Sequence, residues 1–238
     1  MYSEYETPQF AASLFYFDYQ YAKETSADVE EILKEYGFFP PDKIHAYRLT
    51  GNRFRRFSSL KEDVFVKAYA EPDVSGLSMA SGDSRKVADF WTFVWDFTFY
   101  KFTDVDVSKT VFKPWNILTL ESTYGRLNNE ANRQAFLQCV RRLIQYIQPF
   151  YGRLDDIDTI AELDGKPFRP EEKRPVFWGN YWGSEYCKMV GAERLGDLAE
   201  ISFSRMNDGL FFTLTDNLLD CRERICAKRR KMVEKELI

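Results

Sequence analysis

The spacing of apolar and polar residues divides the chain into alternating strand-like and helix-like segments. Aromatic and aliphatic residues crowd into residues 13–19 and 117–121, a composition typical of strands. A helix is predicted after Ser26, because acidic residues follow this N-cap serine and Gly37 offers a stop. Residues 90–102 carry aromatic side chains on both faces, which predicts a central strand that is covered on both sides.

The second half of the chain shows the clearest helical period. In residues 128–147 an asparagine N-cap is followed by apolar residues at every third or fourth position, and a proline ends the pattern. A short helix is predicted at residues 184–190. Two strand-like runs flank Asn207-Asp208-Gly209, which is typical of a hairpin turn. Residues 218–237 predict a charged helix with one apolar side available for docking.

The remaining segments give weaker signals. Residues 43–49 alternate enough to predict a strand, residues 59–69 predict a short helix, and residues 72–89 and 152–175 predict long loops. Together the segments predict an α+β fold, in which helices pack on a mixed or antiparallel sheet.

At 238 residues the chain can form one large domain or two small ones. We expect a compact single α+β domain over residues 1–238, with two tightly packed halves, 1–125 and 126–238, as the alternative. Aromatic residues make up 17% of the chain, which predicts a sizeable core or an aromatic binding surface.

The sequence predicts a cytoplasmic protein. Its acidic N-terminus lacks the pattern of a secretory signal, and no apolar run is long enough to cross a membrane. Four scattered cysteines without CxxC spacing favour reduced thiols over a zinc site, so we expect no metal: Cys139, Cys187, Cys221 and Cys226.

No catalytic motif is complete. The chain has one histidine, His45, with no nucleophile motif around it, and it has no P-loop, GxGxxG, GxSxG or HExxH pattern. Residues 171–173 (Glu-Glu-Lys) lie between prolines, which disfavours a nuclease site, and residues 155–158 lack the glycine and glutamate of a calcium loop. We therefore expect no enzymatic activity, no catalytic residue and no cofactor.

Residues 175–186 form an aromatic–glycine segment, which interleaves five aromatic residues with two glycines. Glycine lets rings and backbone approach closely, so Trp178 and Tyr181 are predicted to fold back onto the core. Any exposed part of the segment would offer anchors to a partner. The structural motif comprises Trp178, Gly179, Asn180, Tyr181, Trp182 and Gly183.

Charge is concentrated in two segments of opposite sign. Residues 153–172 carry net −4 and residues 221–238 carry net +4, while the whole chain carries −4, which argues against nucleic acid as the main partner. Both segments could be solvated faces. The alternative is that the acidic segment is a loop that binds a basic protein partner through Asp155, Asp156, Asp158, Glu162 and Asp164.

From residue 141 onward the chain resembles the immunity proteins of bacterial polymorphic toxins, such as type VI or contact-dependent effectors. The resemblance rests on residues 151–156 (YGRLDD), 176–186 (VFWGNYWGSEY), 191–195 (GAERL) and the hairpin ending at residue 217. The WGNYWG element is its most specific part. The basic C-terminal segment cannot be assigned to the family pattern.

The resemblance implies a cytosolic protein without catalysis that binds a cognate toxin and blocks it by occlusion. On this interpretation the toxin is the partner, with no nucleic acid and no membrane involved. Two other classes remain open: a non-catalytic ligand-binding or scaffold protein, and an enzyme with an unrecognised site.

Overall fold

The computed structural model describes residues 9–16, 23–38, 43–48, 55–56, 74–81, 91–96, 116–164 and 171–237. For the strands between residues 43 and 96 it describes the backbone and its pairing. Within these ranges no helix is long and apolar enough to cross a membrane.

Ten strands of the described residues form one sheet, in the order β3-β2-β4-β5-β6-β1-β7-β8-β10-β9. All neighbouring strands run antiparallel. The strands are β1 (Gln9–Tyr16), β2 (Lys43–Arg48), β3 (Arg55–Arg56), β4 (Val74–Ser81), β5 (Trp91–Asp96), β6 (Asn116–Thr123), β7 (Tyr151–Asp156), β8 (Gly179–Trp182), β9 (Ser202–Met206) and β10 (Gly209–Thr213).

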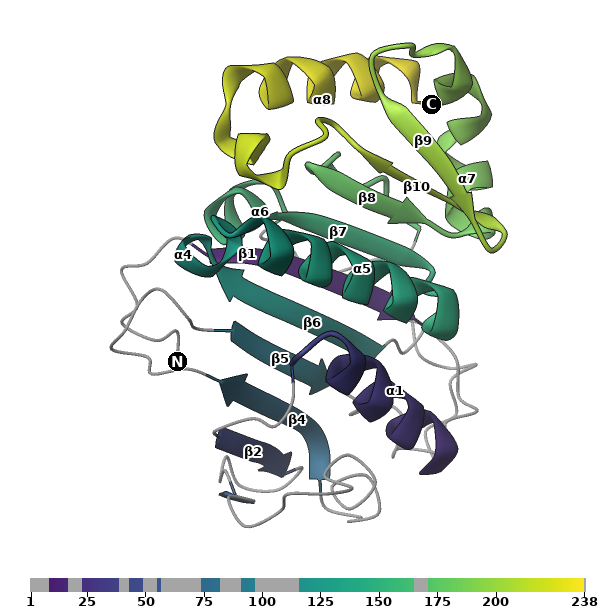
Figure 1. Ribbon diagram of the computed structural model, residues 1–238. Helices are drawn as coiled ribbons and strands as arrows, with labels where there is room; N and C mark the ends of the chain where they lie inside the picture. The colour runs from purple at the N-terminus through teal and green to yellow at the C-terminus, as the bar shows by residue number, and fades with distance from the viewer. Residues whose placement is uncertain are drawn as a thin grey trace.

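The α-helices are α1 (Lys23–Glu35), α4 (Tyr124–Leu127), α5 (Glu130–Ile147), α6 (Ile157–Leu163), α7 (Ser184–Val190) and α8 (Arg224–Glu236). In Figure 1, α1 and α5 lie in front of the sheet, and α8 lies beside the end of the sheet that contains β8, β10 and β9. Two 3₁₀ helices, η2 (Ala192–Asp197) and η3 (Leu218–Arg222), complete the described elements. The predicted α+β class is thus confirmed.

The first strand lies inside the sheet, between β6 and β7. Phe10 pairs with Ser122 of β6 on one side and with Asp156 of β7 on the other. The sheet is therefore continuous across residue 125, the boundary of the two suggested halves.

Helix α5 packs on one face of the central strands, where Figure 1 shows it lying across β1 and β7. Its Phe136 meets Phe10 edge to face, with ring centroids 5.8 Å apart. Asn129 caps the helix by accepting a hydrogen bond from the Asn132 backbone, and Gln148 ends it in the left-handed conformation. The buried residues of α5 recur at helical spacing, as the sequence predicted.

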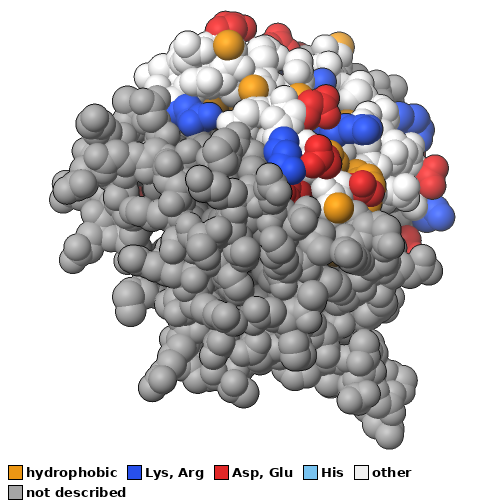
Figure 2. Space-filling view, turned by 60° about the horizontal axis from the view of Figure 1, so that its bottom comes forward, with side chains coloured by type: hydrophobic (Ala, Val, Ile, Leu, Met, Phe, Trp, Pro, Cys, Tyr) orange, Lys and Arg blue, Asp and Glu red, His pale blue; other side chains and the backbone are white. Residues whose placement is uncertain are grey.

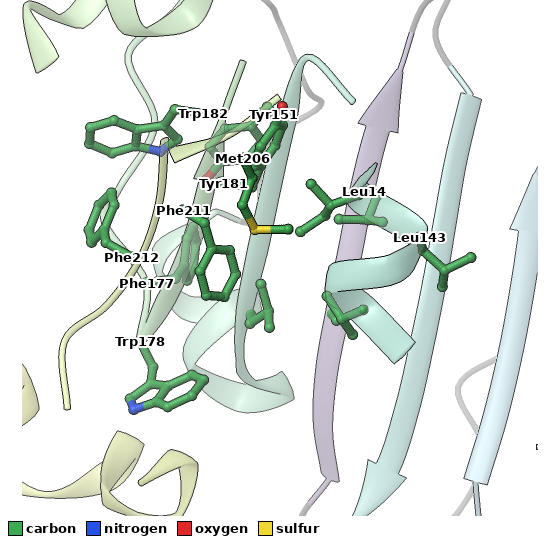
Figure 3. Packing of buried hydrophobic residues seen from close by; sticks show 14 of the residues in the cluster. Leu14, Leu143, Tyr151, Phe177, Trp178, Tyr181, Trp182, Met206, Phe211 and Phe212 are labelled. Carbon is green, nitrogen blue, oxygen red and sulfur yellow. The ribbon is translucent and has the colours of Figure 1, made fainter. Parts of the chain in front are cut away.

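Helix α7 packs on the opposite face. Its Tyr186 lies between Tyr151 and Trp182, with ring centroids 5.1 and 5.7 Å away. Because side chains alternate along a strand, Trp182 and Phe212 project to one side of β8 and β10 while Phe211 projects to the other (Figure 3). The aromatic residues thus form a core on both faces of the same strands.

Several sequence predictions are confirmed. The structure places helices at Glu130–Ile147 and Ser184–Val190 and a hairpin across residues 207–208. The first strand, predicted at residues 13–19, begins earlier, at Gln9. The charged C-terminal helix begins at Arg224, because residues 218–222 form a 3₁₀ turn.

Two loop predictions were wrong. Residues 72–89 contain β4, and residues 152–175 contain most of β7 and all of α6. The sequence of β7, YGRLDD, is polar, yet its burial pattern is that of an inner strand because its acidic residues are paired inside the protein. The predicted helix at 59–69 and the end of the predicted strand at 97–102 lie outside the described residues.

Candidate functional site

The aromatic–glycine segment is built into the core. Its residues from Val176 to Gly183 are all buried, and the large side chains of Trp178 and Tyr181 are 1% and 2% exposed. The predicted burial of these two rings is confirmed. This run therefore leaves no exposed ring to serve as an anchor for a partner, because β8 lies between β7 and β10 and all four of its residues are buried.

Trp178 holds three parts of the chain together. Its backbone amide donates to the carboxylate of Asp155 at 2.8 Å, and its indole nitrogen donates to Thr215 Oγ1 at 2.7 Å. Its ring meets Phe10 edge to face at 5.6 Å. Both N–H groups of this buried residue therefore have an acceptor. Trp178, which directly precedes β8, thus joins β7 to the segment after β10.

The two glycines of the segment lie close to neighbouring atoms, as predicted, but these atoms do not belong to the aromatic rings of the segment. A Cβ at Gly179 would lie 3.0 Å from Leu154 Cβ on the neighbouring strand. A Cβ at Gly183 would lie 2.9 Å from the Pro149 carbonyl oxygen and 3.0 Å from that of Phe150. The space left by glycine therefore accepts a strand neighbour and the main chain, rather than the aromatic rings.

Asp155 and Asp156 lie at the end of β7 and not in a solvent-facing loop, so their predicted exposure was wrong. They are 0% and 1% exposed. Asp155 accepts hydrogen bonds from the amides of Trp178 and Asp156 and from Arg230 Nη2, at 2.8, 2.8 and 2.9 Å. Burial raises the pKa of Asp155 to about 6, although these donors act in the opposite direction.

Asp156 links helix α6 to the C-terminal segment. Its carboxylate caps α6 by accepting from the Asp158 amide at 3.0 Å. The other oxygen accepts from Arg222 Nε at 2.9 Å, and Arg222 also lies over the Tyr124 ring, 5.2 Å from its centroid. Neighbouring acids of one strand are thus each paired with an arginine from residues 221–238.

Asp164 forms a third buried ion-pair group. Its side chain is 4% exposed and accepts hydrogen bonds from both Arg153 and Arg174. The guanidinium of Arg153 also stacks over the rings of Phe15 and Phe177, 5.3 and 5.7 Å from their centroids. Asp164 therefore fixes the chain around α6 and is not accessible to a partner.

Only two of the five predicted binding acids are accessible. The side chain of Asp158 is 88% exposed and lies 3.3 Å from Arg222, and Glu162 is exposed on α6. The sequence did not predict that Arg222 and Arg230 pair with the buried acids Asp156 and Asp155. The signal for such pairing was the equal and opposite net charge of residues 153–172 and 221–238.

A groove of about 470 Å³ lies beside the edge strand of the sheet, between α7, η2 and the β9–β10 hairpin. Its floor includes the half-buried apolar side chains of Cys187, Phe203 and Leu210. Exposed charged residues of both signs surround the floor: Lys188, Glu193, Arg205 and Asp208. An apolar floor inside a charged rim suits a protruding apolar side chain of a partner.

The described residues provide no ready site for a metal or a thiolate nucleophile. No group of three metal-ligating side chains occurs among them. The cysteines are free thiols, and burial raises the pKa of Cys187, that of Cys221 to about 11 and that of Cys226 to about 12. The side chain of His45 lies outside the described part of the structure.

Figure 2 shows the molecule turned by 60° from the view of Figure 1. On the described part of this face, acidic and basic side chains lie next to one another, with hydrophobic side chains scattered between them. This mixture contrasts with the outer side of α8, where exposed positive charge accumulates. The groove has an apolar floor and the outer side of α8 carries exposed charge of one sign. These two surfaces are the candidate binding surfaces.

Comparisons with known proteins show what the fold is similar to. No family model and no curated protein matches the sequence. Among solved structures, the chain is similar to the Pseudomonas aeruginosa T6SS protein PA0821, with a TM-score of 0.62 and 13% sequence identity. The match covers 99% of this chain and 75% of that chain. At this identity the likeness establishes a shared fold with a protein associated with T6SS, the type VI secretion system.

Proposed function

We propose that this chain is a cytoplasmic immunity protein that binds a secreted effector and neutralises it by occlusion, without catalysing a reaction. The observation that carries the proposal is the similarity of nearly the whole fold to a T6SS protein. The resemblance of residues 151–156 and 176–186 to toxin immunity proteins supports it independently. Neither a metal nor a cofactor is part of the proposed activity.

The groove beside β9 is the proposed docking point for the effector. Occlusion requires an interface of about 800 Å² on each partner, with a few buried anchors near its centre. Phe203 and Leu210 are half-buried, so an incoming apolar side chain would remove more of their surface from water. The exposed acids Asp158 and Glu162 remain candidates for contacts with a basic effector surface.

Co-expression tests the proposed function. On this proposal we expect the effector gene to lie beside the gene of this chain. Cells that produce that effector are expected to survive only when the chain is also produced, and the two proteins should co-purify. Survival without physical association would contradict occlusion. Turnover of a substrate by the purified chain alone would favour an enzyme.

A groove-blocking variant tests the docking point. Lys188→Trp places a bulky ring at the exposed rim of the groove, so effector affinity is expected to fall at least about tenfold and protection should be lost. Arg194→Trp is the matched control, because Arg194 is an exposed basic residue of η2 that does not line the groove. Equal affinities of the two variants would place the interface elsewhere.

The groove also supports a second candidate function, the binding of a small ligand. Its volume of about 470 Å³ falls within the range of about 300–1,000 Å³ that is typical of ligand pockets. Saturable binding of a small apolar molecule that is lost in Lys188→Trp, together with no association with the effector, would favour this function.

A further inference from the structure

Four basic side chains follow one line along the outside of α8. We call this set the basic stripe: Arg224, Lys228, Lys231 and Lys235. Successive residues of an α-helix are rotated by about 100°, so spacings of four, three and four place all of them within about 60° of one another. The buried residues Cys226 and Val233 lie on the opposite side of the helix.

The basic stripe has no acidic partner within the described part of the chain, although all of its residues are exposed. The inward-facing Arg230 and the neighbouring Arg222 are paired with Asp155 and Asp156. The acids of α8 and its cap do not lie on the stripe. Glu223 and Glu236 lie about 110° around the helix from the middle of the stripe, and Glu234 accepts a hydrogen bond from the Val176 amide.

We infer that the basic stripe binds an acidic patch on the surface of the effector. This inference rests on the proposed function and adds the charge of the partner surface. The stripe spans about 17 Å, since each residue of a helix rises about 1.5 Å. Unpaired charge at this spacing attracts an opposite patch during encounter and fixes its orientation in the complex.

An acidic protein surface fits the stripe better than a membrane or a nucleic acid does. A helix that lies in a membrane inserts an apolar face, but the apolar face of α8 is buried against the protein body. Nucleic-acid-binding domains are usually strongly basic, whereas this chain has net charge −4. Ile225, 40% exposed beside the stripe, adds an apolar contact suited to a protein interface.

The test compares two variants that remove the same charge. One carries Lys228→Gln, Lys231→Gln and Lys235→Gln, and the control carries Arg142→Gln, Lys173→Gln and Arg194→Gln at exposed sites elsewhere. Association rates with the purified effector encoded beside this chain are measured at about 50 and 500 mM salt. We expect the stripe variant to associate at least about tenfold more slowly at low salt and to lose most of its salt dependence.

The control variant should remain within about twofold of the parent under the same conditions. Equal rates for the stripe and control variants would overturn the inference while leaving effector binding by the parent intact. If the parent does not bind the effector, the proposed function fails and the inference fails with it. Stripe-dependent binding of phosphatidylserine vesicles or duplex DNA, with unchanged effector association, would also overturn it.

Discussion

The inner and outer sides of the C-terminal segment carry the same residue types in opposite roles. On the inner side, Arg230 is 15% exposed and pairs with an aspartate that is fully buried. On the outer side, Lys228 and Lys231 are exposed and have no ion pair within the described residues. The difference shows that the position of a charge on its helix, and not the net charge of its segment, decides whether it stabilises the fold or remains available for binding.

The largest effect on stability is expected in the aromatic core, where the Trp178 amide contacts the buried Asp155. Trp178→Ala is expected to lower the free energy of unfolding by about 3–5 kcal/mol, because it opens a cavity and leaves Thr215 Oγ1 without its indole donor. Chemical denaturation measures the change. Ile225→Ala, at an exposed site on α8, is the control and should change stability by about 0.5 kcal/mol or less. A Trp178→Ala variant as stable as the parent would show that the segment does not hold the core together.

The inner ion pair gives the next largest effect, and its size should depend on pH. Arg230→Met leaves Asp155 buried without its cation, which we expect to lower the free energy of unfolding by about 3 kcal/mol at pH 8. The pKa of Asp155 is already raised to about 6, so ionisation of this group weakens the fold as pH rises from about 4 to 6. Without Arg230 that pKa rises further and the loss continues above pH 6.

The loss caused by Arg230→Met is therefore expected to be smaller at pH 5 than at pH 8, as measured by urea unfolding at each pH. Arg229→Met provides the control. Arg229 donates to the Leu214 carbonyl, does not contact Asp155, and lies 4.0 Å from the exposed Glu200, a pair that contributes little, so its loss should vary little with pH. A pH-independent difference between parent and Arg230→Met would mean that the Asp155 carboxylate does not depend on this arginine.

The close strand contacts of the aromatic–glycine segment should give an intermediate effect. In Gly183→Ala the new methyl group would meet the carbonyl oxygens of Pro149 and Phe150, so the backbone must shift. We expect a loss of about 1–3 kcal/mol by chemical denaturation. Ser202→Ala, at an exposed position of β9, should be nearly neutral. A neutral Gly183→Ala would show that the chain there relaxes freely.

The smallest effect is expected for the accessible acids. Asp158→Asn and Glu162→Gln together should change the free energy of unfolding by about 1 kcal/mol or less, because exposed ion pairs contribute little. Asp156→Asn should cost clearly more, since it leaves Arg222 without its buried partner. If both changes were equally mild, the distinction between inner and outer charges would not hold at this end of the sheet.

Much of the fold was predictable where burial and polarity agree. The helix at Glu130–Ile147 has an apolar stripe and an asparagine cap, and the hairpin at residues 207–208 has turn residues between two strand-like runs. Strand β7 was not predictable in this way, because its buried Asp155 and Asp156 look like loop residues until their arginines are known. Those arginines lie 75 and 66 positions further along the chain.

The candidate site was less predictable than the fold. The sequence singled out Trp178 and Tyr181, but it could not show that the surrounding segment is enclosed by strands on both sides. The groove depends on half-buried side chains from α7, β9 and β10, which become neighbours only in the folded chain. A local pattern of residues carries no information about such neighbours.

The central place of β1 has a consequence for synthesis of the protein on the ribosome. Phe10 pairs with Ser122 and with Asp156, so the partners of an early strand are translated more than one hundred residues after it. At about 5–20 residues per second, β1 remains without both neighbours for on the order of ten seconds. Its segment, with buried Phe10, Leu14 and Phe15, therefore exposes apolar side chains and an unpaired strand during this time and needs shielding from premature association.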